Sequence, residues 1–173
     1  MPTTTIDKIL LGAVALLIVA LVGVVHDTVR DRVIGVGDDA PHFSVRTENG
    51  LTVTPTNFGG KLLVVNFWAS WCPPCIQEIP SLDQFSRTLG DEGVVVLGIS
   101  VDEDGAAYQR VIQQTGLSFL TTRDPSAAIA DQYGTYRYPE SYIINAKGEV
   151  VQKVIGWTEW TDERMLSYIR SLL

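Results

Sequence analysis

Hydrophobic residues form one long run near the start of the chain and several shorter runs after it. The long run, residues 9–25, contains no charged side chain, and at about 1.5 Å per residue a helix of this length just crosses the hydrocarbon core of a bilayer. No polar face interrupts the run, which disfavours a helix buried inside a soluble domain. The pattern therefore predicts a transmembrane helix over residues 9–26.

A cleaved signal peptide is the alternative interpretation of this run. Its basic region would consist of Lys8 beside Asp7, and no cleavage site of the A-x-A kind follows before His26. We therefore expect an uncleaved signal anchor that follows a short cytoplasmic N-terminus over residues 1–8.

Mixed charge and glycine follow the expected anchor. Residues 27–38 include Gly35 and Gly37, and this composition suits a stalk rather than a packed element. The rest of the chain is long enough for one hydrophobic core and too short for two ordinary domains. We therefore expect a single domain over residues 39–173.

Shorter apolar runs predict the elements of this domain. Residues 62–68 and 94–101 are apolar runs of strand length, typical of central strands covered on both faces. Residues 73–89 begin with two prolines, which a first helical turn tolerates, and then repeat apolar residues at helical spacing. The other predicted elements are a hairpin of residues 43–46 and 51–54, helices over 106–114 and 124–133, a hairpin of 141–145 and 150–155, and a helix capped by Thr161. The alternation predicts an α/β fold with a mixed sheet and helices on both faces.

The chain has two cysteines, Cys72 and Cys75, at the predicted junction of strand and helix. A cysteine at a helix N-terminus lies near free N–H groups and the positive end of the helix dipole, which stabilise a thiolate. We therefore expect Cys72 to attack a substrate disulfide and Cys75, one turn later and shielded, to resolve the mixed disulfide.

Two other interpretations of the cysteine pair remain. A zinc site usually needs four ligands, and the chain offers no second cysteine pair, with His26 in the stalk and His42 ahead of the first strand. A purely structural disulfide would close a loop so short that it would add little stability. We expect neither a bound metal nor a cofactor.

Charge restricts the partners of the expected domain. The formal net charge is −7, and residues 1–33 contribute three basic and three acidic side chains, so the whole excess of negative charge falls on the remainder. This balance disfavours nucleic acid and anionic lipid surfaces as partners.

The segment Asn66–Cys75, which reads NFWASWCPPC, resembles the TlpA/ResA/CcmG group of membrane-anchored thioredoxin-like proteins. The resemblance extends to residues 37–43 and 138–144 and so covers nearly the whole expected domain. It implies a thioredoxin fold with an N-terminal β-hairpin and a central insertion over residues 102–133. It also agrees with a single preceding transmembrane helix.

The resemblance also implies roles for residues around the cysteine pair. Pro139, which the sequence alone marks as a proline at the start of a strand, would form a cis peptide bond and face the disulfide. Thioredoxins proper carry a buried Asp where Asn66 stands, so Glu78, on the same helical face as Cys75, is the candidate proton acceptor. An exposed helical glutamate is the alternative for Glu78. The expected substrate-binding residues are Trp71, Pro73, Tyr138 and Glu140.

The expected activity is a thiol-disulfide oxidoreductase that reduces disulfides of extracytoplasmic proteins. Members of the group often act on apocytochrome c and receive electrons from a transmembrane thiol carrier. We therefore expect apocytochrome c and such a carrier as partners of this protein. Strongly oxidising relatives carry a histidine between the cysteines, and here Pro73 and Pro74 stand there, which favours a reductant. A reductant that faces an oxidising exterior must be kept apart from the dithiol oxidases there, which a membrane anchor achieves. We therefore expect the domain on the outer face of a bacterial inner membrane, towards the periplasm or cell exterior.

Two other functions would also suit a thioredoxin-like domain. Peroxiredoxins place Thr or Ser three residues before the reactive cysteine and Pro four residues further upstream, where this chain has Ala69 and Val65. Tethered copper chaperones that supply cytochrome oxidase space their cysteines by three residues and add a distant histidine, whereas here the spacing is two and no histidine follows His42.

Overall fold

The computed structural model describes residues 5–29 and 33–173. The chain divides into two compact units, Met1–Val33 and Ile34–Leu173. The expected cytoplasmic segment 1–8 and the expected stalk 27–38 each fall partly outside the described residues.

The described residues of the first unit form the helix α1 (Thr5–Val29), which confirms the predicted helix and extends it at both ends. Large apolar side chains along this helix are exposed, among them Leu11, Leu16 and Val19. Within the described part of the chain, no helix has both the length and the apolar character that crossing a membrane requires. The helix is thus confirmed, whereas its crossing of a membrane is not.

The second unit is built on a mixed sheet in the order β5-β4-β3-β6-β7. The strands are β3 (Leu62–Trp68), β4 (Val94–Ser100), β5 (Leu120–Arg123), β6 (Glu140–Asn145) and β7 (Val150–Ile155). Strands β4 and β5 run parallel to β3, while β6 is antiparallel to β3 and to β7. Every residue of β3 is buried, as expected of a central strand covered on both faces.

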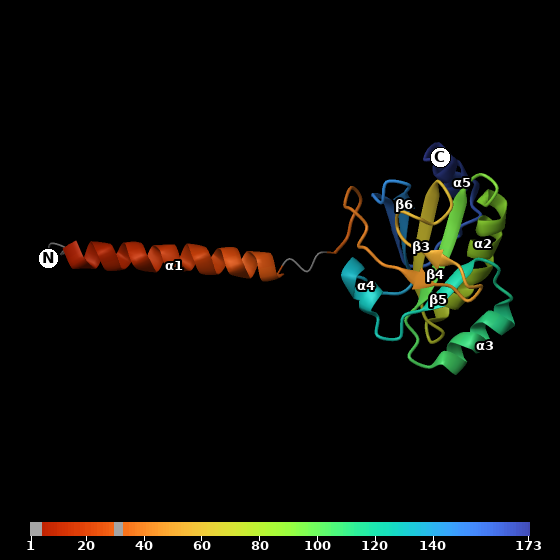
Figure 1. The fold of residues 1–173 in the computed structure, drawn as a ribbon, viewed down its shortest axis with the longest axis horizontal. Coiled ribbons are helices and arrows are strands. Elements are labelled where there is room, and N and C mark those ends of the chain that lie inside the picture. Colours follow the sequence, from red (N-terminus) through yellow and green to blue (C-terminus); the bar gives the residue numbers. More distant parts are fainter. Residues whose placement is uncertain (1–4, 30–32) are drawn as a thin grey trace. The chain divides into compact units, whose positions relative to one another are not determined.

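Helices cover both faces of this sheet (Figure 1). They are α2 (Pro73–Leu89), α3 (Gly105–Thr115), α4 (Ala128–Tyr133) and α5 (Glu163–Ser171). Asn66 of β3 donates a hydrogen bond to Glu78 of α2, whereas the next residue, Phe67, meets the ring of Tyr133 of α4 at 5.3 Å between centroids. Successive strand residues face opposite sides, so α2 and α4 lie on opposite faces of the sheet. The predicted thioredoxin-like α/β architecture is confirmed.

The N-terminal hairpin is confirmed with shorter strands than predicted, β1 (Val45–Arg46) and β2 (Thr52–Val53). Its turn contains Gly50, whose positive φ of 84° suits glycine. The hairpin is tied to the main sheet, because the Thr122 hydroxyl donates to the Arg46 carbonyl at 3.1 Å.

The second unit begins at Ile34, ahead of the expected start at Asp39. The Ile34 side chain is buried, its N–H donates to the Tyr133 carbonyl at 3.1 Å, and its carbonyl accepts from Lys153 Nζ at the same distance. The end of the expected stalk is therefore part of the globular unit.

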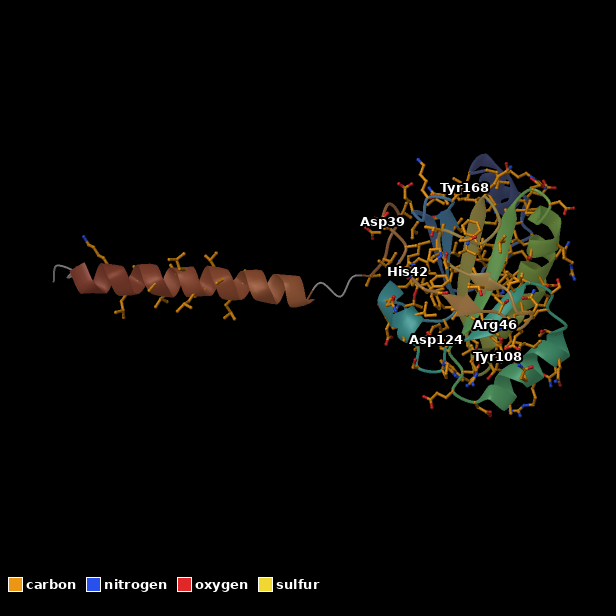
Figure 2. The ribbon with its side chains drawn as sticks, viewed as in Figure 1. Asp39, His42, Arg46, Tyr108, Asp124 and Tyr168 are labelled. Carbon is orange, nitrogen blue, oxygen red and sulfur yellow. A yellow bond between two sulfur atoms is a disulfide. The ribbon has the colours of Figure 1, made fainter. Side chains whose placement is uncertain are left out.

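Strand β5 was not predicted, because it is a four-residue edge strand whose two buried positions are threonines. The predicted helix 124–133 begins later, at Ala128, after Ala127 adopts a positive φ of 53°. Asp124, labelled in Figure 2, lies in the turn ahead of this helix. Its carboxylate still caps the helix, accepting hydrogen bonds from the N–H groups of Ala128 at 3.2 Å and Ile129 at 2.7 Å. The cap of the last helix is Asp162 rather than the predicted Thr161.

Gly98 lies at a close approach in β4, and replacing it with alanine should destabilise the domain. An added Cβ would lie 2.8 Å from Phe119 Cε2 and 3.0 Å from Trp68 Nε1, inside a packed core. We expect Gly98→Ala to lower the free energy of unfolding by about 1–3 kcal/mol in urea denaturation of residues 34–173. Gly35→Ala is the control, since its Cβ meets only Asp38 Oδ2 at 3.7 Å. Equal stability of the two variants would contradict the packing described.

Candidate redox site

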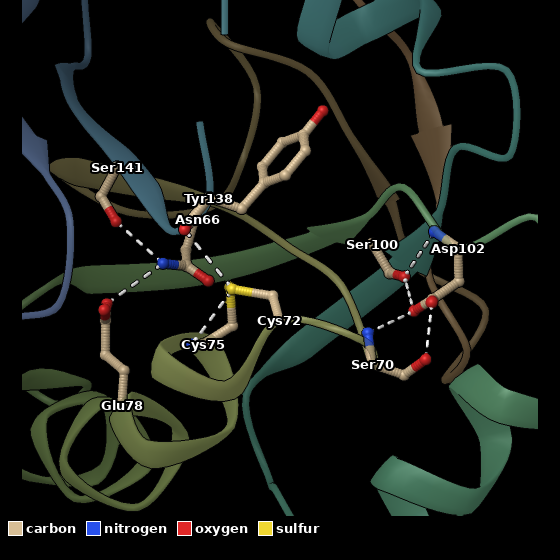
Figure 3. Close-up of a disulfide and its surroundings, with 9 residues drawn as sticks. All are labelled: Asn66, Ser70, Cys72, Cys75, Glu78, Ser100, Asp102, Tyr138 and Ser141. Carbon is tan, nitrogen blue, oxygen red and sulfur yellow. Dashed lines mark hydrogen bonds between the residues drawn. A yellow bond between two sulfur atoms is a disulfide. The ribbon is translucent and has the colours of Figure 1, made fainter. Parts of the chain in front are cut away.

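The two cysteines form a disulfide where β3 passes into α2 (Figure 3). Cys72 occupies the N-cap position and Cys75 lies within the first turn, with their Cα atoms 5.3 Å apart. Both are largely buried, with exposed fractions of 5% for Cys72 and 2% for Cys75. The predicted placement of the pair at a helix N-terminus is confirmed.

The start of α2 presents a hydrogen-bond donor to Cys72. Pro73 and Pro74 fill the first helical positions and have no N–H group, so the first free donor of the helix is the Cys75 amide. This amide donates to Cys72 Sγ at 3.3 Å. When the disulfide is reduced, the same donor and the positive end of the helix dipole favour a thiolate at Cys72.

The loop before β6 faces the disulfide. The Tyr138–Pro139 peptide bond is cis, as the resemblance implied, and the Tyr138 carbonyl oxygen lies 3.4 Å from Cys72 Sγ. Pro139 is buried, and its carbonyl accepts a hydrogen bond from the Gly156 N–H at 2.9 Å. Cys72 is therefore the sulfur adjacent to the cis-proline loop.

Three of the four expected substrate-binding residues gather on the outside of this site. Trp71 is 64% exposed and meets the Tyr138 ring edge to face at 5.9 Å between centroids. Pro73 is exposed beside them, in the first turn of α2. These side chains offer a partly apolar surface next to Cys72.

The fourth, Glu140, does not face solvent. Its side chain is buried, and Oε1 lies 2.8 Å from Lys153 Nζ, which also sits 4.8 Å from the centroid of the Tyr142 ring. The carboxylate of Glu140 is thus paired inside the domain, and this placement does not agree with the expected contact between Glu140 and substrate. Opposite charges on neighbouring strands of the predicted hairpin were the available signal for this pair.

Glu78 is buried one turn beyond Cys75 rather than exposed on the helix. Its Oε1 accepts hydrogen bonds from Asn66 Nδ2 at 3.2 Å and Trp160 Nε1 at 2.6 Å, and Asn66 also donates to Ser141 Oγ at 2.9 Å. Burial raises the pKa of Glu78 to about 7, against the opposing effects of the Trp160 side chain and the Thr158 backbone N–H. Glu78 can therefore exchange a proton near neutral pH.

Another buried carboxylate, Asp102, holds the loop ahead of Cys72. Its Oδ2 accepts from the Ser70 N–H at 2.9 Å and the Ser100 hydroxyl at 2.6 Å, while Oδ1 accepts from the Ser70 hydroxyl at 2.7 Å (Figure 3). Sequence reasoning missed Asp102, Ser141 and Trp160 as parts of the site. Of these three, Asp102 had a signal in the sequence, because it is a polar residue directly after a predicted buried strand.

Candidate metal ligands do not converge in residues 5–29 and 33–173. No group of three or more His, Cys, Asp and Glu side chains there has the arrangement of a metal site.

In a comparison with known proteins, residues 36–153 match the model of the AhpC/TSA family. The chain is 31% identical over 137 residues to the thiol-disulfide oxidoreductase ResA of Bacillus thuringiensis (strain Al Hakam), covering 79% of this chain and 78% of the relative. It is 30% identical over 120 residues to ResA of Bacillus subtilis (strain 168), covering 69% and 67% of the two chains.

Solved structures show the same fold. The crystal structure of a DsbE-type thiol:disulfide interchange protein from Chlorobium tepidum superposes with a TM-score of 0.73 at 26% identity, covering 80% of this chain and 98% of the other. StoA from Bacillus subtilis superposes with a TM-score of 0.64 at 22% identity, covering 77% and 96%.

The titration of Glu78 should make stability depend on pH. Its pKa in the folded oxidised domain is about 7, against 4.5 for an unperturbed glutamate, so the folded state holds the proton more tightly. Stability is therefore lost as pH rises from about 4.5 to about 7 and stays level above that range. Relative to Glu78→Gln, which cannot titrate, the wild type should lose up to about 3 kcal/mol over this interval. Urea denaturation of both proteins at several pH values measures it, and a constant difference would contradict a raised pKa.

Proposed function

The chain belongs to the AhpC/TSA family as a thiol-disulfide oxidoreductase of the ResA type, and from this premise we propose that it reduces disulfides in proteins outside the cytoplasm. The observation that carries the proposal is the asymmetry of the cysteine pair. Cys72 caps the helix next to the exposed Trp71, while Cys75 is enclosed on the side of Glu78. One sulfur is set to meet a substrate and the other to complete the reaction.

The reaction proceeds in two exchanges. The Cys72 thiolate attacks one sulfur of the substrate disulfide, forming a mixed disulfide and releasing the other substrate sulfur as a thiolate. Cys75 then gives up its proton and attacks Cys72 Sγ, which forms the Cys72–Cys75 disulfide and releases the second substrate thiolate. Two electrons pass to the substrate, and both of its thiolates take up protons.

Glu78 is the proposed acceptor of the proton from Cys75. Residues three apart on a helix share a face, and both side chains are buried. A base is most effective when its pKa lies near the working pH, and burial brings the pKa of Glu78 to about 7. Cys75 can therefore be deprotonated locally although its own surroundings exclude water.

Tethering at a membrane is the second part of the proposal. It is supported by the uncharged residues 9–25 and by the exposed apolar side chains of α1. We propose that the redox domain faces the periplasm or cell exterior from a bacterial inner membrane. A transmembrane thiol carrier would return the pair to its dithiol form, and apocytochrome c is the proposed substrate.

A peroxidase is the second candidate, and the match to the AhpC/TSA family favours it. The residues ahead of Cys72 do not, since Ala69 and Val65 replace the hydroxyl-bearing residue and the proline of peroxiredoxins, and both are buried in the core. Peroxide consumption by the reduced protein separates the two functions.

The reduction potential of the Cys72–Cys75 pair tests the reductant function. We expect a value at or below about −250 mV for residues 34–173 equilibrated with dithiothreitol and followed by thiol trapping. This is the thioredoxin end of the range for such pairs. A value of about −120 to −180 mV would place the protein with oxidants and isomerases and overturn the proposed direction of electron flow.

Orientation at the membrane can be tested by fusing alkaline phosphatase after Leu173. The phosphatase needs disulfides and is active only outside the cytoplasm, so the full-length fusion in a bacterial host should be active. The matched control is a fusion to residues 34–173, which lacks α1 and should be inactive. An inactive full-length fusion that is present at normal levels would refute the proposed orientation.

A further inference from the structure

The two oxygens of the Glu78 carboxyl group have different surroundings. Oε1 accepts from the Trp160 indole N–H at 2.6 Å and from the Asn66 amide at 3.2 Å. Oε2 is buried and has no hydrogen-bond partner among the described residues. An unpaired polar atom in a protein interior costs free energy, so an arrangement that leaves one requires an explanation.

The N–H donors favour one oxygen of Glu78 as the proton carrier. Indole nitrogen is a donor only, so the Trp160 N–H occupies one acceptor position of Oε1 in every protonation state of Glu78. The Asn66 amide N–H occupies the other acceptor position of Oε1 in this structure. Oε2, which has no such partner, is therefore the oxygen that is free to take up the proton.

From this geometry we propose that Trp160 is a positioning residue for proton transfer at Cys75: its indole N–H holds Oε1 of Glu78 and leaves Oε2 to receive the proton. The inference rests on the proposed role of Glu78. The step is balanced within the protein, since the Cys75 thiol becomes a thiolate and the Glu78 carboxylate becomes a carboxylic acid. The proton is then available to the departing substrate thiolate.

Trp160 is held against the helix that carries Glu78. The side chain is fully buried, and its ring packs on Phe85 of α2 at 5.1 Å between centroids. Its backbone N–H donates to Ser81 Oγ at 3.4 Å, and that hydroxyl donates to the Glu78 carbonyl at 3.0 Å. Trp160 is therefore anchored to the turns of α2 that carry Glu78, which fixes the separation of donor and acceptor.

No charged side chain in the described residues forms an ion pair with Glu78. Cys75 and Cys72 on the same helical turn are joined in the disulfide and do not titrate in the oxidised chain. The other charged groups on neighbouring elements are bonded elsewhere: Asp83 with Arg87, Glu140 of β6 with Lys153 of β7, Glu159 with Thr161, and Asp162 with Arg164. The N–H groups of the Trp160 indole, the Asn66 amide and the Thr158 backbone are thus the groups that stabilise the charged form of Glu78.

The test follows the Glu78 carboxyl resonance by ¹³C NMR between pH 5 and 9, in the oxidised full-length chain in detergent micelles, with Glu78→Gln to assign the signal. Trp160→Phe keeps an aromatic ring against Phe85 and removes the N–H. Loss of a hydrogen bond to a charged group should move the midpoint of the Glu78 titration upwards by about one pH unit. An unchanged midpoint would overturn the inference.

Turnover separates this role from a structural one. For Trp160→Phe, disulfide reduction should slow about fivefold at pH 7, where fewer Glu78 groups are ionised, and match the wild type near pH 9. Phe85→Leu is the matched control, because it disturbs the same packing but keeps the N–H, and its pH profile should keep the wild-type midpoint. A loss of rate that is equal at every pH would make Trp160 structural only.

Two further measurements keep the outcomes distinct. The indole N–H resonance of Trp160 in the unmodified chain should titrate with the same midpoint as Glu78, and an indole signal that is constant with pH would refute the inference even where Trp160→Phe does not fold. In Glu78→Gln the Trp160→Phe change should cause no further shift in the pH profile. If Glu78→Gln itself leaves the profile of the wild type unchanged, the proposed role of Glu78 fails, and the inference fails with it.

Discussion

The junction between a fully buried strand and the helix that follows it is the constraint on which the redox site depends. Strand β3 is covered on both faces, so the chain must turn directly after Trp68 before α2 can begin. Asp102 closes this turn through Ser70, and two prolines fill the first helical positions. The first N–H group of the helix that is free to donate is therefore that of Cys75, and it donates to the sulfur of Cys72. The reactivity of the pair follows from how the strand and the helix are joined.

The same packing places a carboxyl group where it is costly to ionise. Glu78 lies on the inner face of α2 because its position, three residues after Cys75, points towards β3. An ionised carboxylate without a cation is unfavourable in a protein interior, and the domain limits that cost with two N–H donors on one oxygen. The remaining cost appears as the raised pKa of Glu78, which makes the group able to exchange a proton near neutral pH.

The two buried glutamates on β6 and α2 illustrate how surroundings separate roles. Glu140 has a cation, Lys153, at 2.8 Å and so forms a buried ion pair that fastens β6 to β7 and, through the Ile34 carbonyl, to the start of the domain. The donors to Glu78 among the described residues are neutral. Glu140 is thus paired with an opposite charge, whereas Glu78 has a raised pKa and can change its protonation state near neutral pH. Groups with such shifted pKa values cluster at functional sites.

The sequence by itself determined the elements and the reactive pair, because these depend on local patterns. The apolar run 62–68, the prolines after Cys72 and the spacing of the two cysteines are enough to define a strand, a helix start and a dithiol. The environment of a side chain depends on residues far away in the chain, so only the tertiary structure decided it. Sequence reasoning could not foresee that Trp160 would meet Glu78 across 82 positions. Short-range pattern specifies which groups are present, and long-range packing decides which of them are charged, neutral or exposed.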